Sequence, residues 1–220
     1  MLSIIIAIVL IIVILLLLCL AWRYASQKSS LPCPVWMRWL LDPPLSRGMS
    51  ARTRRTLTRL DLKPGMQVLD AGCGPGRLTI PMAQVVGKEG SVTAMDLQEG
   101  MLKVARDRAD REKLTNISFL QGGIGESRLP PEQYDRMVLI TVLGEIPGRE
   151  AAVQDLYQAL KPGGRLLVEE TIRDPHFQTR STVIGLCEPV GFVEKEFYGN
   201  RFSYTLILEK PPVRNGYSDS

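Results

Sequence analysis

Residues 68–76, VLDAGCGPG, hold the densest set of chemically informative residues in the chain. An apolar stretch runs through Asp70 into a turn that carries Gly72, Gly74 and Gly76 at every second position. Glycine lets a backbone approach a ligand closely, because it has no Cβ and adopts left-handed angles without strain. The pattern predicts a buried strand, a ligand-binding turn and a helix. The alternative is a glycine-rich connection that binds nothing.

The acid and the glycine spacing together indicate the type of ligand. A dinucleotide fingerprint has the spacing GxGxxG and places a pyrophosphate at a helix N-terminus. Here the spacing is GxGxG, and the Asp70 carboxylate would repel a pyrophosphate but attract an ammonium. A second acid, Asp96, ends the next apolar stretch, SVTAMD at 91–96. It lies at the distance downstream at which βαβ nucleotide sites place the acid that binds ribose hydroxyls.

These motifs resemble the class I S-adenosylmethionine-dependent methyltransferases. DAGCGPG at 70–76 is similar to the first motif of that family, Asp96 to the acid that ends its second strand, and LKPGGRLLVEE at 160–170 to its turn and fifth strand. The resemblance covers roughly residues 45–210. It implies S-adenosylmethionine as the cofactor and an α/β, Rossmann-like class I methyltransferase fold. Such a fold is a mostly parallel seven-stranded sheet with an antiparallel C-terminal hairpin.

The resemblance also implies a set of cofactor-binding residues. They are Asp70, Gly72, Cys73, Gly74, Gly76, Asp96, Leu97, Gly123, Ile124 and Thr141. In this arrangement Asp70 orients the ammonium and Asp96 accepts both ribose hydroxyls, which suits a carboxylate. The turn after the third strand, QGGIGE at 121–126, lacks the acid that family members often use to bind the adenine amino group. We expect the backbone at Gly123 and Ile124 to hold the adenine instead, the alternative being that Glu126 reaches back.

Candidate catalytic residues follow the fourth and fifth strands. TVLGEIP at 141–147 contains Glu145, and EETIRDPH at 169–176 contains the only histidine, His176. Methyl transfer is an in-line displacement in which positioning contributes most, and a general base is needed mainly for amine and carbon acceptors. His176 suits that role because histidine titrates near neutral pH, although a structural hydrogen bond is the alternative. The four cysteines are scattered and predict neither a metal site nor a disulfide framework.

Strand and helix patterns alternate after Leu62, which predicts a parallel sheet covered by helices. The expected strands are 66–71, 91–96, 117–121, 135–141 and 165–171, and the expected helices are 77–86, 99–112, 149–160 and 178–189. Residues 192–210 predict two strands joined by a tight turn at Gly199 and Asn200. Little sequence remains for a substrate-recognition insertion. The N-terminal segment and the loops after the fourth and fifth strands must therefore select the acceptor.

The stretch from Leu2 to Trp22 contains no charged residue, which predicts one transmembrane helix over residues 1–24. A cleaved signal peptide is the alternative, but the basic residues that should precede its apolar core are missing. Basic residues follow the span, so the positive-inside rule places the methyltransferase domain, residues 61–211, in the cytoplasm. We expect residues 212–220 to form a flexible tail.

Residues 25–60 predict a basic, amphipathic juxtamembrane segment. Trp36 and Trp39 beside arginines favour a short helix in the lipid headgroup region. The four arginines of residues 52–59 either attract anionic lipid or belong to an ordinary amphipathic helix on the sheet, and the sequence leaves both open. The chain contains no RNA-binding module, which argues against nucleic acid as a partner.

The compact core and the GEIP stretch are similar to the ubiquinone and menaquinone C-methyltransferases and to phospholipid N-methyltransferases. With a membrane anchor, the resemblance implies a small lipophilic or membrane-associated acceptor such as a quinone or a lipid-like molecule. One alternative is a detoxifying methyltransferase of small thiols or xenobiotics. Another is a membrane-tethered pseudo-enzyme that only binds the cofactor, although the intact Asp70, glycines and Asp96 argue against lost cofactor binding.

Overall fold

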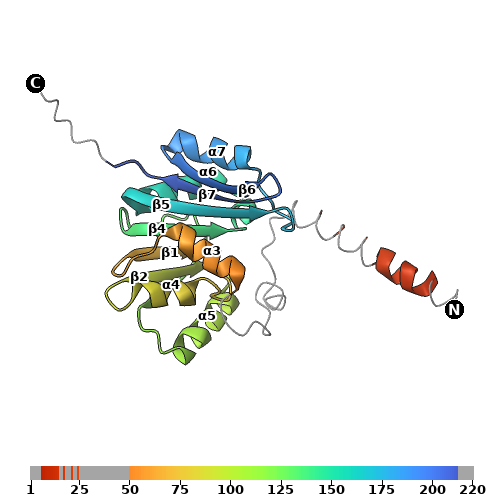
Figure 1. The fold of residues 1–220 in the computed structure, drawn as a ribbon, viewed down its shortest axis with the longest axis horizontal. Coiled ribbons are helices and arrows are strands. Elements are labelled where there is room, and N and C mark those ends of the chain that lie inside the picture. Colours follow the sequence, from red (N-terminus) through yellow and green to blue (C-terminus); the bar gives the residue numbers. More distant parts are fainter. Residues whose placement is uncertain (1–5, 15–16, 18–20, 22–23, 25–49, 213–220) are drawn as a thin grey trace, which may run out of the picture.

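The computed structural model describes residues 6–14, 17, 21, 24 and 50–212. Residues 50–212 form an α/β domain on a single sheet (Figure 1). The transmembrane helix expected over residues 1–24 lies only partly within the described residues, while Trp36, Trp39 and residues 213–220 lie outside them. None of the helices in the described part of the chain combines the length and the apolar character that crossing a bilayer requires.

The sheet has seven strands in the order β3-β2-β1-β4-β5-β7-β6. Their bounds are β1 Gln67–Ala71, β2 Ser91–Asp96, β3 Ile117–Gln121, β4 Tyr134–Ile140, β5 Leu160–Thr171, β6 Val193–Asn200 and β7 Ser203–Glu209. Strands β1 to β5 pair in parallel, whereas β7 is antiparallel to both β5 and β6. The predicted Rossmann-like fold with an antiparallel C-terminal hairpin is therefore confirmed.

Helices cover both faces of the sheet, which explains why its central strands are almost continuously apolar. They are α3 Ala51–Leu60, α4 Thr79–Val86, α5 Glu99–Arg111, α6 Arg149–Ala159 and α7 Arg180–Cys187, with short 3₁₀ turns η2 Leu143–Glu145 and η3 Glu188–Val190. Successive strand residues face opposite sides. Val68 of β1 accordingly packs in one cluster with Leu60 of α3 and Met82 of α4. Its neighbour Leu69 packs in the other cluster, with Leu156 of α6.

The arginine-rich stretch forms α3, which lies on the sheet. Ser50 caps the helix by accepting a hydrogen bond from the Thr53 amide. Thr53, Thr56 and Leu60 recur at helical spacing and form its buried face. The stretch is thus an amphipathic helix of the domain, and several of its arginines lie on the outer face.

Most predicted element boundaries agree with the structure to within two residues, but the hairpin turn and the start of β5 are displaced for identifiable reasons. The hairpin turn lies at residues 201–202 rather than at Gly199 and Asn200, because the Asn200 side chain accepts hydrogen bonds from the Phe202 and Ser203 amides and so closes the turn later. Strand β5 begins at Leu160 rather than at residue 165. The glycines that suggested a turn there form an irregularity within the strand: Gly163 has a φ of 77°, and the pairing with β4 shifts register between Leu160 and Arg165. Backbone hydrogen bonds between residues 163 and 164 and Lys210 keep this segment in the sheet.

The strand order creates a switch point beside the first strand. From β1 the chain adds β2 and β3 on one side, and it later adds β4 and β5 on the other. The connections that follow β1 and β4 therefore leave the sheet in opposite directions. Ligands of open α/β sheets bind in the crevice at such a point.

Candidate active site

A cavity of about 730 Å³ opens at the carboxyl edge of the sheet. It is lined by the connections that follow β1, β2, β3, β4 and β5 and by Arg52 of α3. Its size is typical of sites for small molecules. The cavity brings together Asp70, Gly72, Cys73, Gly74, Asp96, Leu97, Gly123, Ile124, Thr141, Glu145 and His176. Gly76 is not among the lining residues, although its neighbours Pro75 and Arg77 are, and a Cβ on Gly76 would lie 3.0 Å from the Cβ of Ala105 on α5.

The glycine turn is fixed on one side and open on the other. The amides of Gly72 and Cys73 donate to the Met95 carbonyl at 2.8 and 2.9 Å, which ties the turn to the end of β2. A Cβ on Gly72 would lie 2.4 Å from a methyl group of Val142. A Cβ on Gly74 would meet no atom within 4 Å, although this glycine too has a positive φ, of 53°. A ligand can therefore approach the backbone at Gly74.

The Asp96 carboxylate links the first two connections. Its Oδ2 accepts from the Gly74 amide at 2.9 Å, and its Oδ1 accepts from the Gln98 amide at 2.8 Å. Burial raises its pKa, and these two hydrogen bonds oppose that rise. A carboxylate has about four lone-pair positions, so each oxygen can accept one more donor. Asp96 is thus held in place to accept two neighbouring hydroxyls.

Asp70 lies at the bottom of the cavity with 3% of its surface exposed. Burial raises its pKa to about 6, while the hydrogen bond from Thr79 and the charge of Arg77 oppose the rise. The carboxyl group is therefore mostly ionised at neutral pH and can attract a cation. Sequence reasoning did not find Thr79. A hydroxyl residue in the first turn of the helix after the glycines was the feature of the sequence that could have indicated a partner for Asp70.

The turn after β3 forms the adenine side of the predicted site. A Cβ on Gly123 would lie 2.7 Å from Oε1 of Glu126, so the Glu126 side chain occupies the space beside that glycine. Arg128 holds the Glu126 carboxylate through an ion pair of 2.8 Å. Leu97, 56% exposed, also lines the cavity. Both the backbone at Gly123 and the Glu126 carboxylate are thus within the cavity wall.

The acceptor side contains a cluster of ionisable groups. Nδ1 of His176 lies 3.8 Å from Oε1 of Glu145 and 3.8 Å from Oδ1 of Asp174, beyond hydrogen-bond distance. Burial, together with the charges of Asp174 and Asp96, raises the pKa of Glu145 to about 8. The two loops meet tightly, because a Cβ on Gly144 would overlap the His176 carbonyl. Two loops distant in sequence therefore place a histidine and two carboxyls on one wall.

Thr141 occupies a strained position between the two halves of the cavity. Its φ is 53°, which is unusual for a β-branched residue. Its amide donates to the Glu169 carbonyl at 2.8 Å, and this bond holds the backbone in place. Strain of this kind concentrates at functional sites.

Arg52 is a further site residue that the sequence did not identify. Its Nε lies 2.5 Å from Oε1 of Glu169, and Thr56 donates to Oε2 of the same carboxylate at 3.0 Å. The sequence placed Arg52 in a juxtamembrane segment, whereas α3 brings it to the cavity wall. The position of Arg52 at the cavity follows from its contact with Glu169 of β5, which the local sequence does not predict.

A family model described as a methyltransferase domain matches residues 62–189. The chain belongs to this methyltransferase family. The enzyme class and the cofactor predicted from the sequence, a methyltransferase that uses S-adenosylmethionine, are those of the family, and the cavity fits that cofactor by placing Asp70, Asp96 and the open face of Gly74 around one space.

Similar proteins include quinone-pathway enzymes. The chain is 31% identical over 139 residues to the ubiquinone/menaquinone biosynthesis C-methyltransferase UbiE of Shewanella pealeana, covering 62% of this chain and 55% of that protein. It is 32% identical over 118 residues to a demethylmenaquinone methyltransferase of Listeria welshimeri, covering 54% and 50%. The matched segment thus spans about half the length of these relatives. The structure of a SAM-dependent methyltransferase from Aquifex aeolicus shares the fold, with a TM-score of 0.72, 20% identity and coverage of 81% of this chain and 100% of that one.

Proposed function

We propose that this methyltransferase transfers the methyl group of S-adenosylmethionine to a small lipophilic acceptor of the quinone class at a membrane. The observation that carries the proposal is the composition of the cavity at the carboxyl edge of the sheet. Its donor half holds Asp70, Asp96 and the glycine turn, and its acceptor half holds Glu145 and His176. The names of the Shewanella and Listeria relatives support a quinone ring as the acceptor.

The donor half positions the cofactor. Bound there, S-adenosylmethionine supplies an electrophilic methyl group on a sulfonium. Asp70 attracts the ammonium, Asp96 accepts the ribose hydroxyls, and Gly74 leaves room for close approach. Holding the reactants in line in a cavity that excludes water supplies much of the rate in such a displacement.

The acceptor half contains the group that accepts the proton released on methylation. Methylation of a hydroquinone ring at carbon requires the removal of a proton from the ring or its hydroxyl. Glu145, with a pKa raised to about 8, is a base matched to this task at neutral to mildly alkaline pH. We assign it the role of proton acceptor, and His176 the role of holding the neighbouring wall of the cavity.

The N-terminal residues support a membrane location. Residues 6–14 are helical, and their large apolar side chains are 44% to 59% exposed. Such an exposed apolar surface is stable in contact with lipid or another apolar partner. Together with the uncharged stretch at 2–22, this favours a single-pass anchor with the domain in the cytoplasm.

The test uses labelled S-adenosylmethionine and bilayers that contain a demethylated quinol. We expect the labelled methyl group on the quinol ring, identified by mass analysis of the lipid extract. Deletion of residues 1–30 should leave cofactor binding intact and should reduce turnover of the bilayer-embedded quinol far more than turnover of a water-soluble analogue. Equal losses on the two acceptors contradict the membrane part of the proposal. Label that appears only on a thiol or an amine contradicts the quinone part.

A further inference from the structure

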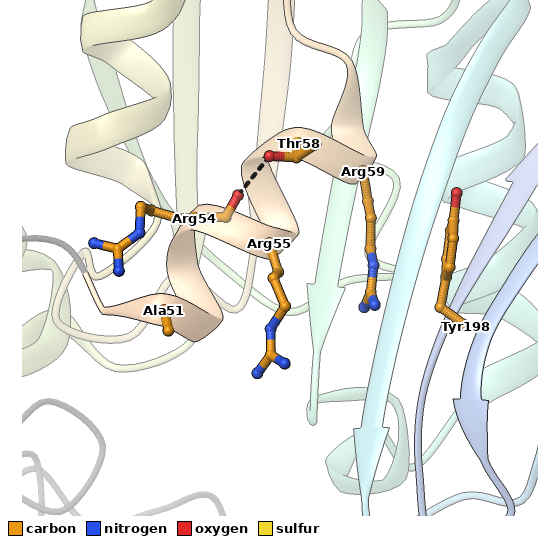
Figure 2. Close-up of a pocket in the computed structure, with 6 residues that line it drawn as sticks. All are labelled: Ala51, Arg54, Arg55, Thr58, Arg59 and Tyr198. Carbon is orange, nitrogen blue, oxygen red and sulfur yellow. Dashed lines mark hydrogen bonds between the residues drawn. The ribbon is translucent and has the colours of Figure 1, made fainter.

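The outer face of α3 lines a second, shallower cavity of about 490 Å³ (Figure 2). Its lining residues are Ala51, Arg54, Arg55, Thr58 and Arg59 of α3 and Tyr198 of β6. The ten residues of α3 include four arginines and no acid. We call Arg54, Arg55, Arg59 and Tyr198 the α3 arginine surface.

Arg59 is held by neutral groups. Its Nη1 donates to the Thr205 hydroxyl at 2.6 Å, and its guanidinium carbon lies 4.4 Å from the centre of the Tyr198 ring. Figure 2 shows the Arg55 and Arg59 side chains extending in the same direction, with Arg59 beside Tyr198. A stacked arginine held in this way is pre-organised to bind an anion.

Within the described residues, Glu196 is an acid that contacts Tyr198 of this surface. Glu196 accepts a hydrogen bond from the Tyr198 hydroxyl, but it also lies 3.5 Å from Arg165. Within the described residues, Glu169 pairs with Arg52, whereas Arg55 and Arg59 have no ion pair. Arg55 and Arg59 therefore give the α3 arginine surface its positive charge.

Exposed apolar side chains lie at the edge of the sheet where α3 begins. Ile172 and Phe202 are 44% and 46% exposed, and the Ile172 amide donates to the Phe202 carbonyl at 2.7 Å. Arg201 lies over the Phe202 ring, 4.5 Å from its centre. Arg52 in the first turn of α3 lines the active-site cavity together with Thr171 and Arg173, the two neighbours of Ile172 in the chain, so this apolar pair lies next to the cavity wall. Arginines beside exposed aromatic and aliphatic groups are the composition of a surface that contacts lipid.

We propose that the α3 arginine surface binds the phosphates of anionic lipid headgroups and seats the opening of the active site on an anionic bilayer. Charge complementarity carries the choice of partner, and residues 23–50 join α3 directly to the uncharged stretch 2–22. The inference rests on the proposed function, since it names the surface through which the site meets its membrane. It adds that anionic lipid regulates the access of the acceptor to the active site, in addition to the anchoring of the chain.

The test compares the full chain in nanodiscs of phosphatidylcholine alone and of phosphatidylcholine with phosphatidylglycerol. Hydrogen exchange should slow at residues 51–60 and 198–203 in the anionic discs, and salt should remove this protection. The double variant R54Q/R55Q should lose the protection, and its ratio of quinol turnover between anionic and neutral discs should fall at least about fivefold. These substitutions remove two charges and keep side chains of similar size.

The matched control removes two charges from α5. The variant K103Q/R111Q, at exposed positions outside both cavities, should keep the wild-type protection and the wild-type turnover ratio. Equal exchange in the two kinds of disc, or equal effects of the two double variants, overturns the inference. Protection by a short DNA duplex in place of phosphatidylglycerol overturns it as well. If no acceptor is methylated in any disc, the proposed function fails, yet the exchange comparison still decides this inference.

Discussion

Thr79 donates a hydrogen bond of 2.6 Å to Oδ2 of Asp70, and it thereby connects the first turn of α4 to the end of β1. Burial raises the pKa of Asp70 to about 6, and the Thr79 hydrogen bond opposes that rise. The hydroxyl thus helps to keep an anion at the bottom of the cavity at neutral pH.

Replacing this hydroxyl should change how cofactor binding depends on pH. In Thr79→Val the pKa of Asp70 should rise further, so Asp70 should be partly neutral at pH 7 and the affinity for S-adenosylmethionine should fall. Calorimetric titrations between pH 5.5 and 8.5 should show the loss of affinity at a higher pH than in the wild type. Thr79→Ser keeps the donor and serves as the control. Superimposable pH profiles for the Val and Ser variants contradict this role of Thr79.

Alanine at the first and second glycines of the turn should have different effects. At Gly72, a Cβ would lie 2.4 Å from Val142 and φ is 75°, so Gly72→Ala should lower the free energy of unfolding by about 3 kcal/mol. At Gly74 the space is open, so Gly74→Ala should cost only about 1–2 kcal/mol from its left-handed backbone. It should nevertheless weaken cofactor binding about tenfold, because the methyl group enters the ligand's space.

The contact with Val142 offers a direct check on the Gly72 prediction. Adding Val142→Ala to Gly72→Ala should recover part of the lost stability, measured by chemical denaturation as a double-mutant cycle. A coupling energy near zero would show that the backbone angle alone, and not the contact, sets the cost.

Glu170 should make stability fall as pH rises. It is 1% exposed, and burial raises its pKa to about 8, above its ordinary value of 4.5. Between these two values the folded state holds a proton that the unfolded state has released, so the free energy of unfolding decreases by about 1.4 kcal/mol per pH unit for this group. In Glu170→Gln the slope measured between pH 5.5 and 7.5 should be less steep by that amount. The exposed Glu188→Gln is the control, and an unchanged slope in Glu170→Gln contradicts the prediction.

The sequence predicted the elements whose signals are local. Apolar runs that end in Asp70 and Asp96, with glycines between them, identified the first two strands and the cofactor turn. The turn after β6 was misplaced because the Gly199–Asn200 pair resembles a hairpin turn, whereas the Asn200 side chain closes the turn two residues later, at 201–202. Side-chain hydrogen bonds of this kind do not follow from residue types alone.

Site residues that depend on tertiary contacts escaped prediction. Arg52 reaches the cavity because Glu169, 117 residues later, accepts its hydrogen bond. The pairing of the Glu145 loop with the Asp174 loop depends on how closely η2 approaches the end of β5, which the spacing of residues does not encode. Periodicity therefore located the edge of the sheet, and packing determined which side chains meet there.

The pH dependence of turnover should separate the roles of Glu145 and His176. If Glu145 accepts the proton, its carboxylate form is required, so kcat should rise with pH up to about 8, the pKa that burial gives this group. In Glu145→Gln kcat should fall about 100-fold and this rise should disappear, because an amide accepts no proton. In His176→Asn the rise should remain, with a smaller loss of kcat, because the base is still present.

Both variants are compared by the rate of single-turnover methyl transfer to a quinol, and the exposed Glu150→Gln on α6 serves as the control. A rise that survives in Glu145→Gln and vanishes in His176→Asn assigns the proton to the histidine instead.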